Sequence, residues 1–178
     1  MLFCDLETDR LILKNIGRED REFILEQFSD DAVNRYLFDA EPLGSLEEAD
    51  EIIDFYTQPE PRAQHRWVIL QKSDGAKIGT CGFHGWDQGN GATDVGYDLR
   101  RVYWGRGIMT EALREILHFA VRAMGVRRID AHIYADNRKS TALAQRLGFA
   151  WNGATELCVF RGKEYLHHIY SLDCSAMR

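Results

Sequence analysis

The sequence has few features of a membrane protein, a secreted protein or a metalloprotein. No apolar run approaches the ~20 residues that a helix needs to cross a bilayer. The segment Met1 to Glu7 lacks the basic start and long apolar core of a secretory signal. None of the four cysteines stands in a C-x-x-C pair, so we expect buried or free thiols rather than disulfides or metal ligands. The sequence therefore predicts a cytoplasmic protein with no membrane contact and no metal site.

A basic surface is also missing. The formal net charge is −6 at pH 7, and this disfavours binding to nucleic acid, which needs clustered Lys and Arg. The same charge is compatible with a cationic partner, although an acidic surface more often serves solubility alone. No internal repeat and no Pro-, Gly- or Ser-rich linker divides the 178 residues. We therefore expect residues 1–178 to form a single domain with a sizeable core.

Hydrophobic periodicity predicts alternating strands and helices. Strands are expected over residues 8–16, 66–71, 77–86, 93–100, 128–135, 151–160 and 164–172. Helices are expected over residues 18–28, 45–56, 107–124 and 137–147, and Ser45 with Glu48 forms a capping box for the second of them. This order predicts an α/β (α+β) protein with a mixed sheet and helices on both faces. The crossover unit in the C-terminal half is where ligands of such sheets tend to bind.

The segment Tyr97 to Ala112, Y-D-L-R-R-V-Y-W-G-R-G-I-M-T-E-A, carries the strongest functional signal. A strand pattern ends there, Gly105-x-Gly107 follows, and a helix begins. Two glycines allow main-chain N–H groups to converge on one point, because no β-carbon blocks them. The positive end of the helix dipole favours an anion at this point, and Arg106 adds a mobile positive charge. We therefore predict a loop that binds a phosphate or diphosphate.

With these residues in place, the chain resembles the GNAT superfamily of N-acetyltransferases. Its nearest resemblance is to the RimJ/RimL-type branch, which acetylates N-terminal amines of ribosomal proteins. The matching segments, in order, are T-D-R-L-I-L, D-V-G-Y-D-L, W-G-R-G-I-M-T-E-A-L and A-D-N-R-K-S-T-A-L-A-Q-R-L-G-F. The resemblance implies an acyl-CoA N-acyltransferase fold, with a mostly antiparallel sheet splayed between its fourth and fifth strands. It also implies acetyl-CoA as co-substrate, an amine-bearing acceptor, and a homodimer, since homodimers are common in this branch.

The resemblance also assigns residues to the cofactor. The diphosphate of coenzyme A would lie in a loop formed by Gly105, Arg106, Gly107, Ile108, Met109 and Thr110. The pantetheine arm would pair with the backbone near Leu99, and Asn137 and Ser140 would face this arm and the thioester. The superfamily pattern has Gln or Arg where this chain has Val102. Main-chain amides are therefore expected to do most of the phosphate binding.

Acetyl transfer to an amine needs a neutral amine, a polarised carbonyl and a stabilised leaving thiolate. Asp94 and His132 are alternative proton acceptors, directly or through water. The alternative interpretations are a surface charge on a strand for Asp94 and a hydrogen-bonded pocket histidine for His132. Ser140 is the expected donor to the thiolate, because Ala144 stands where many relatives have a tyrosine; otherwise Ser140 only helps to start its helix. We expect direct attack by the amine in a ternary complex.

The acceptor is expected between the first two helices and the last hairpin. Tyr36, Phe38, Asp39 and Glu41 combine aromatic and acidic side chains there, which would favour a cationic amine, although an ordinary surface loop has the same composition. Three functions remain open at this point. They are acetylation of protein N-termini, acetylation of a small amine (a polyamine, amino sugar or antibiotic), and acyl-CoA binding without catalysis.

Overall fold

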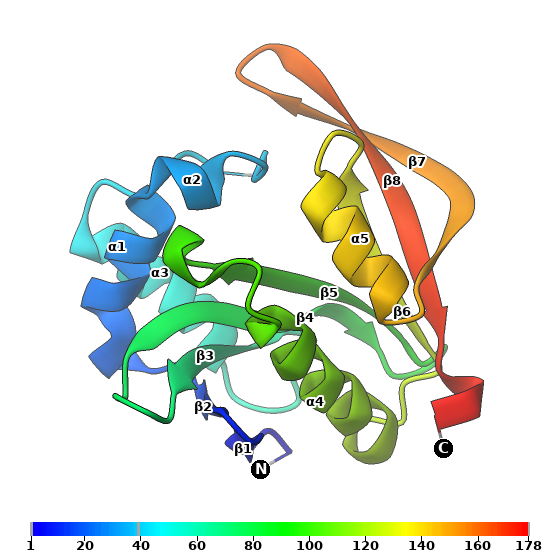
Figure 1. The fold of residues 1–178 in the computed structure, drawn as a ribbon, viewed down its shortest axis with the longest axis horizontal. Helices are drawn as coiled ribbons and strands as arrows, with labels where there is room; N and C mark the ends of the chain where they lie inside the picture. Colours follow the sequence, from blue (N-terminus) through cyan, green and yellow to red (C-terminus); the bar gives the residue numbers. More distant parts are fainter. Residues whose placement is uncertain (1, 39, 178) are drawn as a thin grey trace.

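The computed structural model describes residues 2–38 and 40–177, and within them eight strands form one sheet in the order β1-β2-β3-β4-β5-β6-β8-β7 (Figure 1). Neighbouring strands are antiparallel except β5 and β6, which are parallel. The strands are β1 (Leu6–Glu7), β2 (Leu11–Asn15), β3 (His65–Gln71), β4 (Lys77–Asp87), β5 (Ala92–Leu99), β6 (Arg128–Tyr134), β7 (Ala150–Phe160) and β8 (Lys163–Asp173). The predicted mixed, mostly antiparallel sheet is confirmed.

The helices follow the predicted order closely. They are α1 (Arg21–Ser29), α2 (Asp31–Asn34), α3 (Leu46–Thr57), α4 (Ile108–Ala123) and α5 (Arg138–Arg146). Three short 3-10 turns are η1 (Arg18–Asp20), η2 (Arg101–Tyr103) and η3 (Cys174–Met177). None of the helices in the described ranges is long and apolar enough to span a bilayer.

The N-terminal strand differs from the expectation. The sequence predicts one strand over residues 8–16, but only Leu11–Asn15 (β2) is a strand there, and it forms a hairpin with the preceding β1 (Leu6–Glu7). The Leu11 N–H donates to Thr8 Oγ1 at 3.1 Å, and the Thr8 N–H donates to the Leu11 carbonyl at 3.0 Å, so a tight turn replaces the first residues of the predicted strand. The sequence pattern also does not predict α2, a single helical turn that the Asp30 side chain caps.

Helices cover both faces of the sheet, as predicted (Figure 1). In β3, Trp67, Val68 and Ile69 are all 0% exposed, so successive side chains meet a packed layer on each side. Val68 packs with Ile24 of α1 and Ile53 of α3. Trp67 and Ile69 belong instead to the larger core that contains the apolar face of α4.

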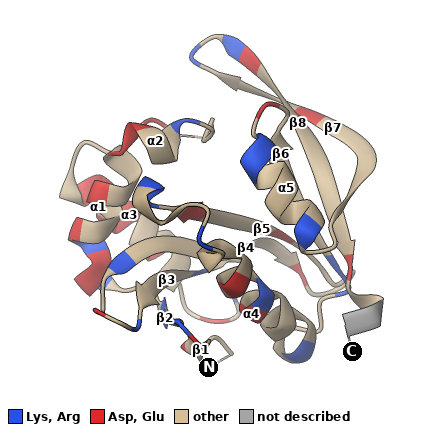
Figure 2. Cartoon of the chain, viewed as in Figure 1, with Lys and Arg blue, Asp and Glu red and all other residues tan. Residues whose placement is uncertain are grey.

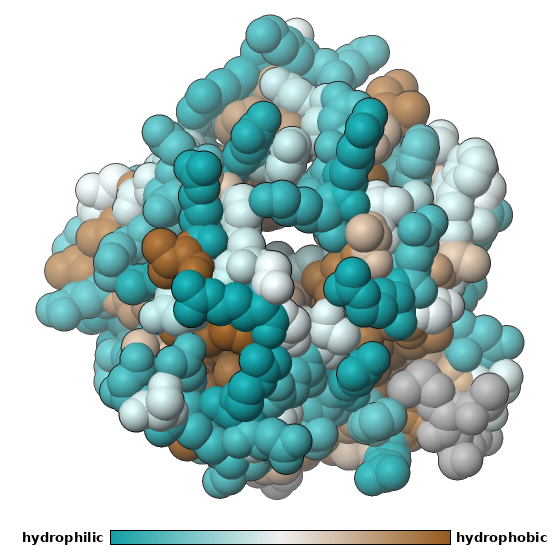
Figure 3. All heavy atoms as spheres, viewed as in Figure 1, coloured by the Kyte–Doolittle hydropathy of each residue, from teal (hydrophilic) through white to brown (hydrophobic). Residues whose placement is uncertain are grey.

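Strands β5 and β6 separate along their length. Their pairing runs from Ala92 with Arg128 to Asp94 with Asp130 and then stops, although both strands continue. The predicted splay between the fourth and fifth strands is therefore confirmed; these strands are β5 and β6 because β1 precedes the first predicted strand. Figure 3 shows the molecule hollowed near its centre, where Figure 1 has β5 on one side and α5 on the other.

Candidate active site

The loop between η2 and α4 has the backbone conformation that its glycines allow. Gly105 has φ +75° and Gly107 has φ +73°, in the left-handed region that residues with a β-carbon disfavour. A β-carbon at Gly105 would meet nothing within 4 Å, and one at Gly107 would lie 3.6 Å from Nη2 of Arg10. The glycines are therefore required by the backbone dihedral angles rather than by crowding within the chain.

This loop presents main-chain donors at the start of α4. Within the described part of the chain, the N–H groups of residues 105–110 donate no hydrogen bond, and the first intrahelical bond runs from Glu111 N to the Gly107 carbonyl at 3.1 Å. These donors and the positive end of the α4 dipole fit an anionic group such as a diphosphate. The side chains that anchor this end of the helix in the core are Ile108, Met109 and Thr110.

Glu111 ties the loop to the N-terminal hairpin. Its Oε1 accepts from Thr8 Oγ1 at 2.5 Å and from the Arg10 N–H at 2.9 Å, and its Oε2 lies 2.6 Å from Arg10 Nε. Arg10 Nη1 donates in turn to the Arg106 carbonyl at 3.0 Å. Partial burial acts to raise the pKa of Glu111, but the hydrogen bonds from Thr8 and Arg10 outweigh it and lower that pKa. Glu111 thus orients the start of the helix.

Replacing Glu111 by alanine is expected to lower the free energy of unfolding by about 2 kcal/mol, because Thr8 and Arg10 lose a charged acceptor. The pKa of Glu111 is lowered on folding, so this stabilisation is present at neutral pH and is lost as the pH falls through the folded-state pKa. Urea unfolding at neutral and acidic pH measures both effects. Glu115→Ala, one turn further along α4, is the control, and an equal loss in both variants would contradict this role.

Beyond Asp94 and Asp130, β5 and β6 diverge and leave a gap that is called the opening below. The edge of β5 that faces this opening carries main-chain groups. The Arg100 N–H donates to the Ile78 carbonyl of β4 at 2.9 Å, so by the alternation of an antiparallel ladder Tyr97 and Leu99 turn their N–H and C=O groups away from β4. The Leu99 carbonyl already accepts from Trp104 Nε1 at 2.7 Å. The main-chain groups of Tyr97 and the Leu99 N–H therefore face the side on which β6 has diverged.

The other wall of the opening is the start of α5. Asn137 caps this helix, since its Oδ1 accepts from the Ser140 N–H at 3.2 Å. The hydroxyl of Ser140 lies 2.6 Å from the hydroxyl of Tyr97, which reaches across from β5. Sequence analysis did not single out Tyr97, because a tyrosine in a strand pattern indicates core packing. The floor beneath the opening is apolar and consists of Val95, Leu113, Leu117, Ala131, Ala144, Leu147 and Phe149.

Basic side chains gather around the opening although the chain is acidic overall. Figure 2 shows Lys and Arg before α4 and at the start of α5, and the sequence places Arg101, Arg106, Arg138 and Lys139 in these segments. The Lys139 ammonium lies 4.2 Å from the centre of the Trp104 ring, so it links α5 to the glycine loop. This local positive charge favours a phosphorylated ligand.

Asp94 and His132, the two alternative proton acceptors, lie side by side. His132 Nε2 is 3.6 Å from Asp94 Oδ1, and His132 Nδ1 is 2.7 Å from Glu156 Oε2. Contact with Asp94, and then with Glu156, raises the pKa of His132 to about 9, so the imidazole is protonated at neutral pH. Sequence analysis missed Glu156 of β7, which reaches His132 of β6 across β8, the strand that pairs with both.

His84 lies on β4, beside the middle of β5. A β-carbon on Gly96 would come within 2.8 Å of His84 Cε1, so the ring covers this glycine. The Tyr56 hydroxyl contacts His84 Nε2 at 2.5 Å. Burial, and then the positive charge of Arg66, lower the pKa of His84 to about 4, and the ring is neutral at pH 7. A lone histidine in a strand pattern gave no signal of this position.

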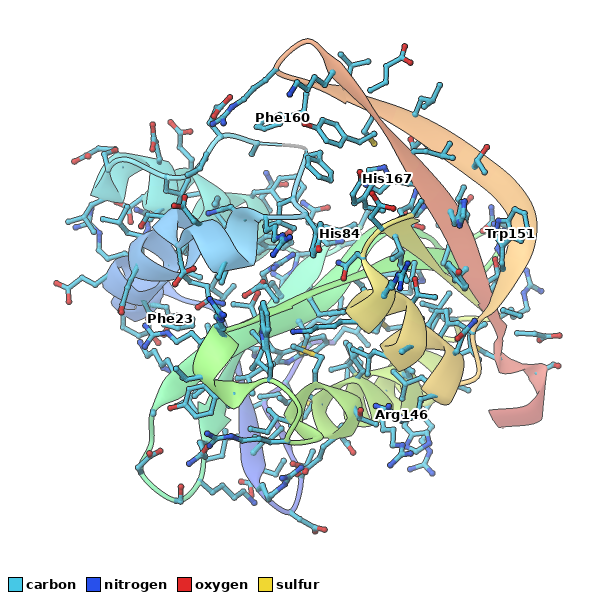
Figure 4. The ribbon with its side chains drawn as sticks, turned by 45° about the horizontal axis from the view of Figure 1, so that its top comes forward. Phe23, His84, Arg146, Trp151, Phe160 and His167 are labelled. Atoms are coloured by element: carbon cyan, nitrogen blue, oxygen red, sulfur yellow. The ribbon has the colours of Figure 1, made fainter. Side chains whose placement is uncertain are left out.

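Aromatic rings form the mouth of the opening on the side of α2. Phe38, in the loop after α2, stacks on Tyr165 of β8 with ring centres 3.8 Å apart and meets Tyr134 of β6 edge-on at 5.0 Å. The ring centres of Tyr36 and Tyr134 lie 5.9 Å apart. In Figure 4 the labelled Phe160 and His167 mark the hairpin side of this mouth, and His84 lies nearer the centre of the molecule.

The loop after α2 is also joined to the β7–β8 hairpin by an ion pair. Arg161 Nε donates to Glu41 Oε1 at 2.9 Å, and a hollow of about 240 Å³ lies between α2, this loop and the hairpin. The segment expected to receive the acceptor thus meets the last hairpin, although Asp39 lies outside the described residues. In residues 2–38 and 40–177, no group of three or more His, Cys, Asp or Glu side chains is arranged to hold a metal ion.

Comparison with known proteins agrees with this geometry. The family model described as "Acetyltransferase (GNAT) domain" matches residues 10–150. The uncharacterized N-acetyltransferase YoaA of Bacillus subtilis (strain 168) is 32% identical over 173 residues, which cover 96% of this chain and 97% of that protein. The ribosomal-protein-serine acetyltransferase of Escherichia coli (strain K12) is 28% identical over 104 residues, 58% of each protein.

A solved structure shares the whole fold. Spermidine N-acetyltransferase from Vibrio cholerae, in complex with CoA and spermine, superimposes with a TM-score of 0.82 at 19% identity, and the match covers 96% of this chain and 100% of that one. This similarity concerns the fold. The family match spans most of the chain and includes the glycine loop and the start of α5. The chain therefore belongs to the GNAT acetyltransferase family, and it is an acetyl-CoA-dependent N-acetyltransferase.

Proposed function

We propose that the acceptor is the N-terminal amine of a protein, such as a ribosomal protein, and that this amine attacks directly in a ternary complex. The observation that carries the proposal is the mouth above the splay. It combines an aromatic wall around Phe38 with one carboxylate pair, Asp94 and Glu156, that shares His132. Similarity to the ribosomal-protein-serine acetyltransferase of E. coli supports the same class of acceptor.

The charges at this mouth favour a single amine over a polyamine. The carboxylates are accompanied by fixed cations: Glu41 pairs with Arg161, and the Asp94–Glu156 pair holds a protonated His132. A polyamine would bring several positive charges close to these cations, and each would need a carboxylate of its own. One α-amine needs only one negative charge, and the aromatic rings can pack against the residue that bears it.

We propose the following roles in the transfer from the same geometry. Acetyl-CoA supplies an activated acetyl group, and the N–H groups of residues 105–110 with Arg106 would hold its diphosphate. The Tyr97 and Leu99 main chain would position the pantetheine arm and the carbonyl. Asp94 or His132 would take the proton that the amine must lose. No side-chain nucleophile is needed on this route.

Replacing Ser140 by alanine is expected to lower kcat about tenfold, because Ser140 would donate a hydrogen bond to the leaving thiolate. The dissociation constant of acetyl-CoA should change little, since Asn137 keeps the cap of α5 and the diphosphate site is untouched. Steady-state kinetics and calorimetry separate the two quantities. An unaltered kcat would remove Ser140 from the chemistry.

A thiol-release assay with acetyl-CoA and a panel of acceptors tests the choice of acceptor. The panel should contain a peptide with a free N-terminal serine, the same peptide with its N-terminus blocked, spermidine and an amino sugar. Turnover confined to the free peptide N-terminus supports the proposal. Turnover with the small amines alone would contradict it and assign the enzyme to small-molecule acceptors.

A further inference from the structure

The two walls of the opening touch through a pair of hydroxyl groups. Strand β5 and strand β6 are unpaired beyond Asp94 and Asp130, yet the Tyr97 hydroxyl on β5 lies 2.6 Å from the Ser140 hydroxyl on α5. The Tyr97 ring packs against the main core, so its position is set by the floor of the opening. The contact therefore joins a fixed tyrosine to the serine that would face the thioester.

We propose that Tyr97 is a positioning residue for acetyl transfer, and that it donates a hydrogen bond to Ser140 Oγ and thereby directs the Ser140 proton toward the sulfur of the leaving group. This inference rests on the proposed function, in which Ser140 stabilises the thiolate. It adds a residue from a different element of the fold and fixes the direction of the hydrogen bond between the two hydroxyls.

Either hydroxyl could donate across the 2.6 Å contact, and the proposal makes Tyr97 the donor because the Ser140 proton is then free for the sulfur. A serine hydroxyl has one proton and two acceptor lone pairs. Burial raises the pKa of Tyr97, so its hydroxyl keeps its proton and remains a donor. With Tyr97 donating, the single Ser140 proton is free for another acceptor. The helix cap does not compete for Ser140 Oγ, because Asn137 supplies it, and Ala144, one turn further along α5, offers no side-chain donor.

The transfer step is balanced without a proton leaving Tyr97. As the amine nitrogen bonds to the carbonyl carbon, the C–S bond breaks and its electron pair stays on sulfur. The proton lost by the amine goes to the acceptor at Asp94 and His132, or to water. The hydrogen bond from Ser140 stabilises the thiolate while its charge develops, and the hydrogen bond from Tyr97 to Ser140 strengthens that donor through polarisation.

The first test measures the bound product and needs no acceptor. The thiol pKa of CoA in the binary complex is obtained from the ultraviolet absorbance of its thiolate, with each free protein as the reference. Tyr97→Phe, which keeps the ring, is expected to raise this thiol pKa by about one unit relative to the wild type, because a charge-stabilising hydrogen bond weakens. Ser140→Ala should raise it at least as much. An equal thiol pKa in the wild type and Tyr97→Phe would overturn the proposal.

Tyr170→Phe is the matched control. Tyr170 is a buried tyrosine of β8 that packs in the same core as Tyr97 but lies outside the pair of hydroxyls. This variant should leave the thiol pKa of bound CoA and the kcat unchanged. A shift of the same size in Tyr170→Phe and Tyr97→Phe would show a general effect of losing a buried hydroxyl and would contradict the specific role of Tyr97.

The second test is a double-mutant cycle on kcat. Tyr97→Phe alone should lower kcat about fivefold to tenfold, with the dissociation constant of acetyl-CoA within twofold of the wild type. In the Ser140→Ala background the same substitution should have no further effect, because Tyr97 acts through Ser140. Additive losses would show a purely structural role and overturn the inference. Absence of turnover in the wild type would contradict the proposed function instead, and the thiol titration would still decide the role of Tyr97.

Discussion

Replacing Gly105 and Gly107 together by valine is expected to weaken acetyl-CoA binding more than 100-fold, which is about 2.7 kcal/mol. Both glycines have φ near +75°, and a β-branched residue strongly disfavours this region. The chain would relax to negative φ at both positions, and the N–H groups of residues 105–110 would then turn away from their common point. A diphosphate in this loop would lose its donors, and valine side chains would occupy its place.

Gly75→Val provides the matched control for this experiment. Gly75 has φ +70° in the β3–β4 turn, and a β-carbon there would meet nothing within 4 Å. The substitution should therefore cost a similar free energy of unfolding per residue, of the order of 1–2 kcal/mol. Calorimetry with acetyl-CoA should show normal affinity for Gly75→Val and a large loss for the loop variant. Equal affinity in both would show that the glycine loop does not hold the diphosphate.

The glycine loop was predictable because its parts are consecutive in the chain. A strand, two glycines and a helix start define the loop from one short segment, and the left-handed φ of Gly105 and Gly107 is the physical reason why glycine is needed there. The splay between β5 and β6 came from the family resemblance rather than from periodicity. Periodicity gives the bounds of each strand but not the residue at which two strands stop pairing.

Contacts between distant residues were not predictable in the same way. Tyr97 and Ser140 are 43 positions apart, and His132 and Glu156 are 24 positions apart. The first pair depends on the angle between the diverging strands, and the second depends on β8 being inserted between β6 and β7. Asp94 was predicted as one of two alternative proton acceptors, and only the register of β5 with β6 shows that it adjoins the other.

The rate of acetyl transfer is expected to rise with pH up to about 9 if His132 is the proton acceptor. Asp94 and Glu156 raise the pKa of His132 to about 9, so about 1% of the imidazole is neutral at pH 7 and half is neutral at pH 9. The value of kcat/KM should then increase roughly 50-fold over this interval. The acceptor amine titrates in the same range, and His132→Gln, which leaves that ionisation in place, should remove the part of the rise that belongs to His132.

Glu156→Gln gives the sharper result, because it should raise activity at neutral pH. Loss of one carboxylate lets the pKa of His132 fall toward its ordinary value, so the alkaline limb of the pH profile moves to lower pH. Glu164→Gln, on the exposed hairpin, is the control for loss of a negative charge.

The ion pairs of His132 with Asp94 and Glu156 also stabilise the fold. Because folding raises the pKa of His132, their contribution to the free energy of unfolding is full below its ordinary pKa and disappears as the pH rises through 9. Glu156→Gln should therefore also weaken this pH-dependent stabilisation. If the variant does so but loses activity at every pH, the Glu156 carboxylate is the proton acceptor instead.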